Sequence, residues 1–189
     1  EDRKVTISRA KITIDYPAGF MLVSSMNPCP CGYFNHPTKD CVCAPGIVQK
    51  YLNRISGPLL DRIDLHVEVT PVSFDEMAAK YQAEKSEFIR ERVVKAREAQ
   101  LKRFDEIEGM HSNAQMHSKQ LRQVCRISKE GTEMLKQAMD RLNLSARAYD
   151  RILKVSRTIA DLEGSENIES VHLAEAIQYR SLDREGWMR

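Results

Sequence analysis

The stretch Arg54-Ile-Ser-Gly-Pro-Leu-Leu-Asp-Arg-Ile-Asp64 decides the fold class, because it leads directly into a strand pattern. Apolar residues alternate with others over residues 63–69, which is the period of a β-strand. Earlier in the chain, Phe20-Met-Leu-Val23 is a short continuous apolar run of the kind that forms buried parallel strands. We therefore expect the first part of the chain to be a fragment of an α/β parallel sheet.

Small polar residues follow this apolar run and lead to Asn27 and Pro28. The carboxyl ends of parallel strands are where α/β sheets bind ligands. Pro28 disfavours a helical conformation for the residue before it, so Asn27 should be extended. An amide there can orient a water molecule towards a γ-phosphate, because it both donates and accepts hydrogen bonds. The alternative is a turn-forming Asn-Pro pair without a chemical role.

Four of the five cysteines are clustered in two Cys-x-Cys pairs. They are Cys29, Cys31, Cys41 and Cys43. Four thiolates can form a closed tetrahedral zinc site, and we expect zinc here. The spacing is less standard than that of paired Cys-x-x-Cys knuckles, and His36 or Asp40 could replace one thiolate. The alternatives are reduced cysteines in a loop rich in Pro and Gly, or a disulfide formed during handling.

Two short alternating runs, 5–7 and 12–14, flank Ser8-Arg-Ala-Lys11 and predict a β-hairpin. Arg9 and Lys11 would lie at its tip. Cations in such a place can follow the phosphate backbone of DNA, although no aromatic residue accompanies them to stack on bases. An exposed, solvated turn is the alternative.

From Phe74 onwards the apolar residues recur with helical period, so we expect an α/β domain over residues 1–73 and an all-helical domain over residues 74–189. The expected segments are a helix capped by Ser86, a loop over 110–120, a helix over 129–142, a helix that begins at Ser145 and ends at Gly164, and a helix capped by Ser170. The residues expected to face inward in the first three of these helices are Ile89, Val93, Ala96, Leu135, Ala138, Leu142, Tyr149, Ile152, Ile159 and Leu162.

Arginines are candidates for phosphate binding, because a guanidinium forms bidentate contacts with phosphate oxygens. Arg62 lies at the entrance of the strand expected over 63–69, and Arg54 is a second candidate. An ion pair between Arg62 and Asp61 or Asp64 is the alternative role.

Arg147 lies in the first turn of the helix expected to begin at Ser145. A cation at a helix amino terminus is mildly unfavourable unless it has an anionic partner. Arg147 is thus a further candidate for phosphate binding, and a solvated surface arginine is the alternative. The cations over 90–103 are interleaved with glutamates and predict a solvent-exposed face whose charges pair with one another.

The composition limits the function classes. With 189 residues, 42% of them hydrophobic, the chain can form one good core or two modest ones. A net charge of +2 argues against a strongly basic DNA-binding domain, so nucleic-acid affinity would have to come from local clusters or several subunits. The sequence contains no apolar run of membrane-spanning length, no secretory signal and no disulfide framework, and we expect a cytoplasmic protein.

Taken together, these motifs resemble a known family. Residues 20–28, the cysteine cluster and residues 54–68 resemble the bacterial magnesium-chelatase-like ATPases of the AAA+ class, of the competence-associated ComM/YifB type. Residues 144–151, 158–161 and 174–180 also fit the carboxyl-terminal pattern of that family. The resemblance implies a partial AAA+ core followed by an all-helical lid.

The resemblance also implies roles for single residues. Asn27 corresponds to sensor 1, Arg62 or else Arg54 to an arginine finger that acts on ATP held by the neighbouring subunit, and Arg147 to the sensor 2 arginine of the lid. ATP and Mg²⁺ are the implied cofactors. The implied assembly is a hexameric ring that couples ATP hydrolysis to movement along single-stranded or branched DNA during natural transformation, with the hairpin tips converging on a central channel.

The sequence contains no Gly-x-x-x-x-Gly-Lys-Ser/Thr motif and no strand that ends in paired acidic residues. We therefore expect a carboxyl-terminal fragment whose phosphate-binding loop lies upstream and which does not hydrolyse ATP alone. One rival is a magnesium-chelatase ATPase subunit that drives metal insertion into a tetrapyrrole, although the Cys-Pro-Cys-Gly cluster favours the ComM type. Another is a non-catalytic zinc-binding interaction module, favoured if the natural protein begins near Glu1.

Overall fold

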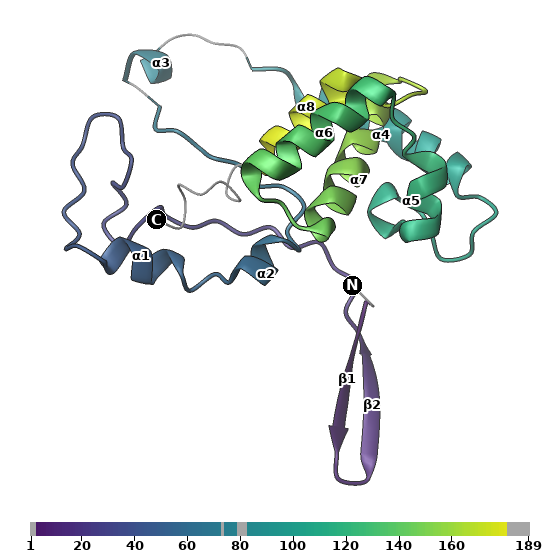
Figure 1. Ribbon diagram of the computed structural model, residues 1–189, viewed down its shortest axis with the longest axis horizontal. Helices are drawn as coiled ribbons and strands as arrows, with labels where there is room; N and C mark the ends of the chain where they lie inside the picture. Colours follow the sequence, from purple (N-terminus) through teal and green to yellow (C-terminus); the bar gives the residue numbers. More distant parts are fainter. Residues whose placement is uncertain (1–2, 73, 79–82, 181–189) are drawn as a thin grey trace. The chain divides into compact units, whose positions relative to one another are not determined.

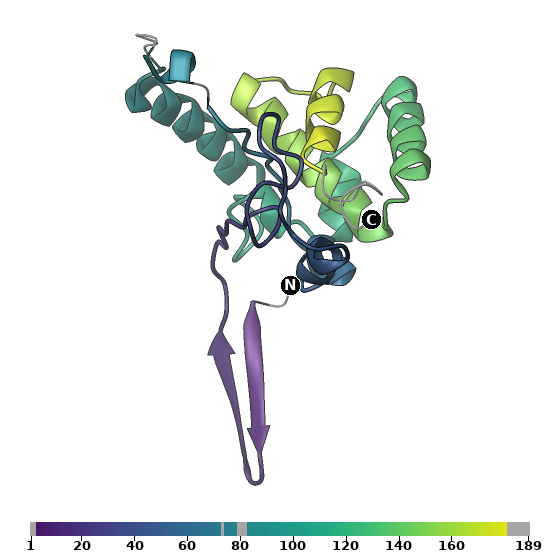
Figure 2. The same ribbon diagram turned by 90° about the vertical axis from the view of Figure 1, so that its left-hand side faces the viewer.

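The computed structural model describes residues 3–72, 74–78 and 83–180. The chain forms two compact units, Glu1–Cys43 and Ala44–Arg189. Figures 1 and 2 show a two-stranded ribbon in the first unit and a group of packed helices in the second. The elements of the second unit are α1 (Ile47–Leu52), α2 (Gly57–Leu60), α3 (Phe74–Ala78), α4 (Ser86–Arg103), the 3₁₀ helix η1 (Asn113–Gln115), α5 (Ser118–Val124), α6 (Lys129–Leu142), α7 (Ala146–Glu163) and α8 (Ser170–Gln178).

The first unit contains the predicted hairpin, formed by β1 (Lys4–Arg9) and β2 (Ile12–Pro17). The strands are antiparallel, and Arg9 is opposite Ile12 at the turn. Because side chains alternate between the faces of a strand, one face is polar and carries cross-strand hydrogen bonds. Thr6 donates to Asp15 at 2.5 Å, and the Lys4 ammonium lies 3.2 Å from the same carboxylate.

The other face of the hairpin is apolar and exposed. Its residues are Val5, Ile7, Ile12, Ile14 and Tyr16, which are 45–64% exposed. The turn between the strands passes through Ala10 at φ 50°, in the left-handed region.

The structure does not show the parallel-sheet fragment that the sequence predicts. Phe20–Val23 and residues 63–69 have no strand structure, and the side chains of 20–23 are 63–87% exposed. A parallel strand needs hydrogen-bonding neighbours and helices over its faces. Among the described residues only β1 and β2 pair, so these two segments have no sheet to join.

The helices of the second unit pack around α7. It contacts α8, α4, α5 and η1, and Figure 1 shows it passing between these elements. Its buried residues Ile152 and Leu153 meet Leu135 of α6 and Leu173 of α8 in one hydrophobic core. Among the described residues from 74 onwards the regular secondary structure is helical, in agreement with the expected helical part of the chain.

Local capping residues explain where two of these helices begin and end. The hydroxyl of Ser145 accepts a hydrogen bond from the Ala148 backbone at 3.2 Å, and Gly164 ends α7 at φ 78°. The hydroxyl of Ser128 caps α6 in the same way, and Asn143 ends it at φ 49°. Asparagine tolerates this left-handed conformation better than most residues.

Three local predictions are wrong. Lys85 and Glu169 occupy the N-cap positions predicted for the serines that follow them, so Ser86 and Ser170 are the first helical residues. The loop predicted over 110–120 contains η1 and the first turn of α5.

Some predicted inward faces are only partly correct. Ile152 is 1% and Ala96 2% exposed, whereas Tyr149 and Leu162 are 37% and 41% exposed. Ile89 and Val93 are each 43% exposed, because the amino-terminal half of α4 extends beyond the other helices (Figure 2).

A buried polar network crosses the helical core. The carboxylate of Asp161 on α7 accepts two hydrogen bonds from the Arg103 guanidinium, at 2.5 and 2.8 Å. It also accepts hydrogen bonds from the Asn113 amide at 2.7 Å and from Arg157 Nε at 3.1 Å. Burial disfavours the charged form of Asp161, but these hydrogen bonds and the two guanidinium charges outweigh burial and hold its pKa below the ordinary value. The network therefore fixes α4, η1 and α7 to one another.

Candidate metal centre and nucleotide-site arginines

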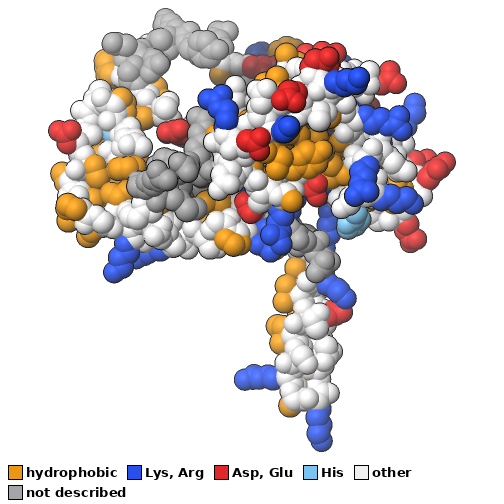
Figure 3. Space-filling view, in the orientation of Figure 1, with side chains coloured by type: hydrophobic (Ala, Val, Ile, Leu, Met, Phe, Trp, Pro, Cys, Tyr) orange, Lys and Arg blue, Asp and Glu red, His pale blue; other side chains and the backbone are white. Residues whose placement is uncertain are grey.

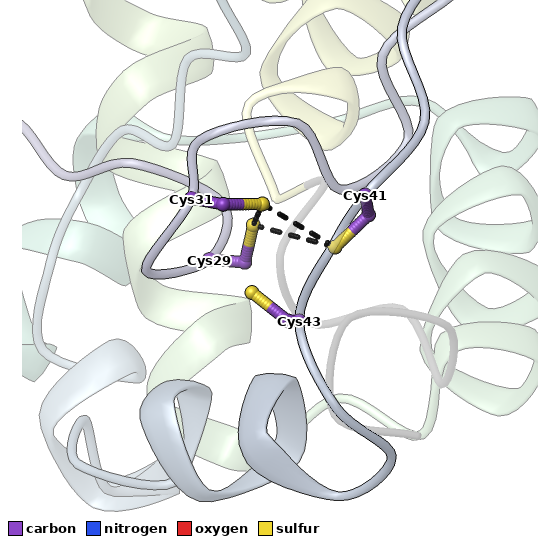
Figure 4. A group of neighbouring side chains, drawn as sticks. All are labelled: Cys29, Cys31, Cys41 and Cys43. Atoms are coloured by element: carbon purple, nitrogen blue, oxygen red, sulfur yellow. Dashed lines mark hydrogen bonds between the residues drawn. The ribbon is translucent and has the colours of Figure 1, made fainter.

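The four clustered cysteines converge on one point. Figure 4 shows their side chains directed towards one another from the two arms of a loop. Sγ of Cys29 lies 3.3 Å from that of Cys31 and 3.8 Å from that of Cys41, and all four sulfurs lie within 4.8 Å of one another. A tetrahedron with Zn–S bonds of about 2.3 Å has sulfur–sulfur edges of about 3.8 Å. The spacing fits that geometry and exceeds the roughly 2.05 Å of a disulfide bond.

The backbone near the cluster is shaped for thiolate ligands. The Gly32 backbone donates to the Cys29 carbonyl at 3.0 Å, and Gly32 has φ 83°, a conformation that other residues rarely adopt. The Phe34 N–H then donates to Cys29 Sγ at 3.3 Å. Cys29 is fully buried. Backbone N–H groups directed at sulfur stabilise its negative charge, as a metal-bound thiolate requires.

The metal-free cluster has strongly divergent acidities. A backbone hydrogen bond from Tyr33 is the main cause that lowers the pKa of Cys31 to about 6. For Cys43, a backbone hydrogen bond from Cys31 lowers the pKa, but burial and the neighbouring thiols outweigh it and raise the pKa to about 12. Four close thiols cannot all ionise without a cation between them. A divalent metal would supply that charge, so the donor set fits Zn²⁺.

The structure decides between the alternative ligands for this site. Nδ1 of His36 already accepts hydrogen bonds from the backbones of Thr38 and Lys39, each at 3.1 Å. Within the described part of the chain, the four cysteines form the one group with metal-ligand spacing, and neither His36 nor Asp40 belongs to it. All five cysteines are free thiols, so the predicted alternative of a disulfide is not seen.

Arg54 and Arg62 lie outside the short helix α2, Arg54 before its amino end and Arg62 after its carboxyl end. Arg62 is exposed, and its Nη1 donates to the Pro58 carbonyl at 2.6 Å. The guanidinium of Arg54 lies 5.9 Å from the centre of the Tyr51 ring. Asp64, one of the two ion-pair partners considered for Arg62, pairs with a different arginine, as described next.

The segment that carries Arg62 is held on the helical bundle by residues for which the sequence predicted no such role. Arg180, only 1% exposed, donates to the carbonyls of Ile63 at 2.5 Å and Leu60 at 3.5 Å. The His66 backbone donates to the Tyr179 carbonyl at 2.8 Å. The burial of Arg180 would have indicated this contact, but burial cannot be inferred from the sequence around Arg180. The sequence alone therefore contains no signal for it.

A second contact joins the same segment to α7. Nη1 of Arg151 lies 2.9 Å from Oδ1 of Asp64, and the Arg151 side chain is 16% exposed. Arg147, the candidate sensor 2 residue, is exposed one helical turn earlier, in the first turn of α7. Arg151 and Arg147 therefore share one face of the same helix end.

The two remaining candidate sites lie in the first unit. Asn27 is exposed in a segment without regular secondary structure, directly before the loop that carries the four clustered cysteines. Arg9 and Lys11 flank Ala10 at the turn of the hairpin, and Figure 3 shows cationic side chains projecting from its end. Among the described residues, no contact of Asn27, Arg9 or Lys11 indicates which ligand they would bind. Their roles therefore stay predictions. None of the described helices has the length and apolar character needed to cross a membrane.

Comparison with known proteins covers both units. The family described as magnesium chelatase, subunit ChlI, matches residues 1–77, and its C-terminal family matches residues 83–180. Competence protein ComM of Haemophilus influenzae is 42% identical over 185 residues, which cover 97% of this chain and 35% of that protein. The uncharacterized protein YifB of Escherichia coli is 40% identical, with the same coverage.

An uncharacterized protein of Mycobacterium tuberculosis is 36% identical over 180 residues, 95% of this chain. The chain spans about a third of the length of these curated relatives, 35% in each case. The two family models describe the same magnesium-chelatase subunit, and they match consecutive parts of this chain that together cover nearly all of it. The chain therefore belongs to the magnesium-chelatase family and is similar to the ComM and YifB proteins.

Proposed function

We propose that this chain is the carboxyl-terminal part of a ComM-like AAA+ ATPase that couples ATP hydrolysis to movement along DNA. The observation that carries the proposal is the match to ComM along 97% of the chain, together with both chelatase families. In this proposal, the rest of the ATPase supplies the phosphate-binding loop and most contacts to ATP and Mg²⁺, and the subunits form a hexameric ring.

The proposed chemistry uses three exposed side chains of this chain. Asn27 orients the attacking water, and Arg147 contacts the γ-phosphate from the helical lid of its own subunit. Arg62 enters the site of the neighbouring subunit, where its guanidinium stabilises the charge that develops during phosphoryl transfer. Arg62 suits this role because its side chain is exposed while the backbone beside it is fixed by Arg180. Arg54 is the second candidate for the finger.

The first unit would contact DNA and hold the metal. Arg9 and Lys11 form an exposed pair of cations at a hairpin turn, suited to phosphate oxygens rather than to bases. The cysteine cluster would hold zinc in a closed structural site, with no position left for a substrate.

Replacing Arg62 tests the proposal. In the intact ATPase, Arg62→Ala should lower ATP turnover by about 10³-fold and leave nucleotide affinity nearly unchanged, because an arginine finger acts mainly in the transition state. Arg90→Ala, which changes an exposed arginine of α4, is the matched control. Steady-state ATPase assays and nucleotide titration measure both quantities. Near-normal turnover of the Arg62 variant would contradict the assignment.

A second candidate function is ATP-driven insertion of magnesium into a tetrapyrrole. It is favoured by the name of the two matching families. The two functions differ in what should stimulate ATP turnover. DNA should do so for a ComM-like enzyme, whereas a porphyrin with its chelatase partner subunits should do so for a chelatase.

A further inference from the structure

We propose that Arg151 is a positioning residue that links the lid helix α7 to the arginine finger of the same subunit. The inference rests on the proposed function. The ion pair between Arg151 and Asp64 transmits the position of the lid to Arg62. Through Arg62, the lid position then affects the ATP site of the neighbouring subunit.

The geometry of the finger segment carries this inference. Asp64 lies two residues after Arg62, and its carboxylate is 2.9 Å from Arg151 Nη1. At the residue before Asp64, the buried Arg180 guanidinium donates to the Ile63 carbonyl at 2.5 Å. The backbone between Arg62 and Asp64 is thus held from α7 and from the end of α8.

The position of Arg151 on α7 supplies the link to nucleotide. Arg147 is one turn closer to the helix amino terminus, and α7 is a continuous helix of 18 residues. A displacement of its first turns when Arg147 meets a γ-phosphate would also displace Arg151, because a helix moves as a rigid element over this length. Asp64 would follow through the ion pair, in which the Arg151 side chain is 16% exposed and the Asp64 side chain 48% exposed.

An alternative role for Arg151 is direct contact with ATP of its own subunit, as a second lid arginine. The structure favours the positioning role, because the Arg151 guanidinium is already paired with Asp64 and its side chain is only 16% exposed. The two roles differ in which subunit's ATP site loses activity, and this difference can be measured.

Single and paired substitutions in the intact ATPase give the first measurement. Arg151→Ala and Asp64→Ala should each lower kcat on the order of tenfold or more at unchanged KM, because a misplaced finger loses transition-state contacts. The double variant should be no worse than either single variant. Exchanging the charges, with Asp64→Arg and Arg151→Asp together, should restore part of the lost rate. Arg141→Ala on α6 is the matched control and should behave as wild type.

Mixed rings give the decisive measurement. Asn27→Ala subunits have a defective ATP site but a normal finger, and Arg62→Ala subunits have the reverse. If Arg151 positions the finger, an equal mixture of Arg151→Ala and Asn27→Ala subunits should recover activity. About a quarter of the interfaces would then combine an intact ATP site with an intact finger. A mixture of Arg151→Ala with Arg62→Ala subunits should not recover activity, because both carry a defective finger. The opposite pattern would overturn the inference, and so would recovery in neither mixture or a wild-type rate for Arg151→Ala alone.

A reference mixture separates this inference from the proposed function. Arg62→Ala mixed with Asn27→Ala must recover activity if fingers act between subunits. Failure of that mixture would contradict the proposed trans-acting finger itself. Recovery there, with no recovery for Arg151→Ala with Asn27→Ala, would contradict only the positioning role.

Discussion

At the scale of single residues, Asp161 is the side chain on which the most polar contacts of the helical core depend. Its side chain is 1% exposed and pairs with the guanidinium groups of Arg103 and Arg157. The Arg157 side chain is also nearly buried. Removing one partner of a buried ion pair is costly, because the charge that remains has lost its compensation.

We therefore predict that Asp161→Asn lowers the free energy of unfolding of this chain by about 3 kcal/mol or more. Urea denaturation followed by circular dichroism measures the change. Asp140→Asn, at an exposed position of α6, should have little effect. Equal stability of the two variants would show that the network contributes little to folding.

The same residue predicts a pH dependence. The folded-state pKa of Asp161 is lower than its ordinary value of 3.8, so its contribution to stability is complete above that value. The contribution is lost as pH falls below about 4, through the folded-state pKa. Acid titration of stability in this range should be steeper for the parent chain than for Asp161→Asn, and parallel curves would contradict this assignment.

The sequence predicted the cysteine cluster but not this network. Two Cys-x-Cys pairs in one loop restrict where four sulfurs can lie, so local sequence is sufficient to predict that cluster. The partners of Asp161 come from α4, η1 and α7, and no spacing rule connects them. A signal was present nevertheless, because Arg157 and Asp161 are spaced by four residues along the buried stripe of α7.

At the scale of elements, α6 and α8 approach closely at Gly131. A Cβ atom added there would lie 2.7 Å from Leu173 Cδ1, which belongs to a fully buried side chain. Alanine is normally better than glycine in a helix by about 1 kcal/mol. The steric conflict in a packed core should outweigh this gain.

We predict that Gly131→Ala lowers the melting temperature of the chain. Leu173→Ala removes the conflicting atom, so in that background Gly131→Ala should become neutral or stabilising. Differential scanning calorimetry of the four proteins in this double-mutant cycle provides the measurement. An increase in melting temperature from Gly131→Ala alone would mean that Leu173 moves aside at little cost.

Helices were easier to predict from this sequence than strands, for a physical reason. A helix satisfies its own backbone, so Ser145 and Gly164 are enough to determine where α7 begins and ends. A strand satisfies its backbone only with a neighbour, and the apolar runs at 20–23 and 63–69 have no such neighbour within the described residues. Their apolar pattern is suited to strands inside a sheet, but these segments do not form strands in this structure.

At the scale of the whole molecule, the loop with the four clustered cysteines (residues 29–43) and the helical core lie in separate compact units. The residues of the hydrophobic core cluster all lie after position 103, whereas the four clustered cysteines lie between 29 and 43. Protein purified without chelator should contain about one equivalent of zinc. Stripping the metal should increase amide hydrogen exchange over 29–43 and leave the unfolding of the helical unit unchanged.

Elemental analysis and hydrogen exchange with mass spectrometry test this prediction. Cys41→Ser should lose most of the metal, and Cys125→Ala, which changes the buried cysteine of the helical core, should keep it. Freshly reduced protein without any transition metal would rule out the zinc site. A helical unit that melts earlier after metal removal would show that the two units stabilise each other.

The exposed apolar face of the hairpin, from Val5 to Tyr16, has a consequence for concentrated solutions of this chain. A two-stranded ribbon with one exposed apolar face and unpaired edge strands tends to associate with other molecules. The small net charge of +2 supplies little colloidal repulsion. Sulfate and other strongly hydrated salts would drive these faces together, while the same salts would weaken the proposed contacts of Arg9 and Lys11 with DNA. Buffers suited to purification and buffers suited to DNA binding therefore coincide at low ionic strength.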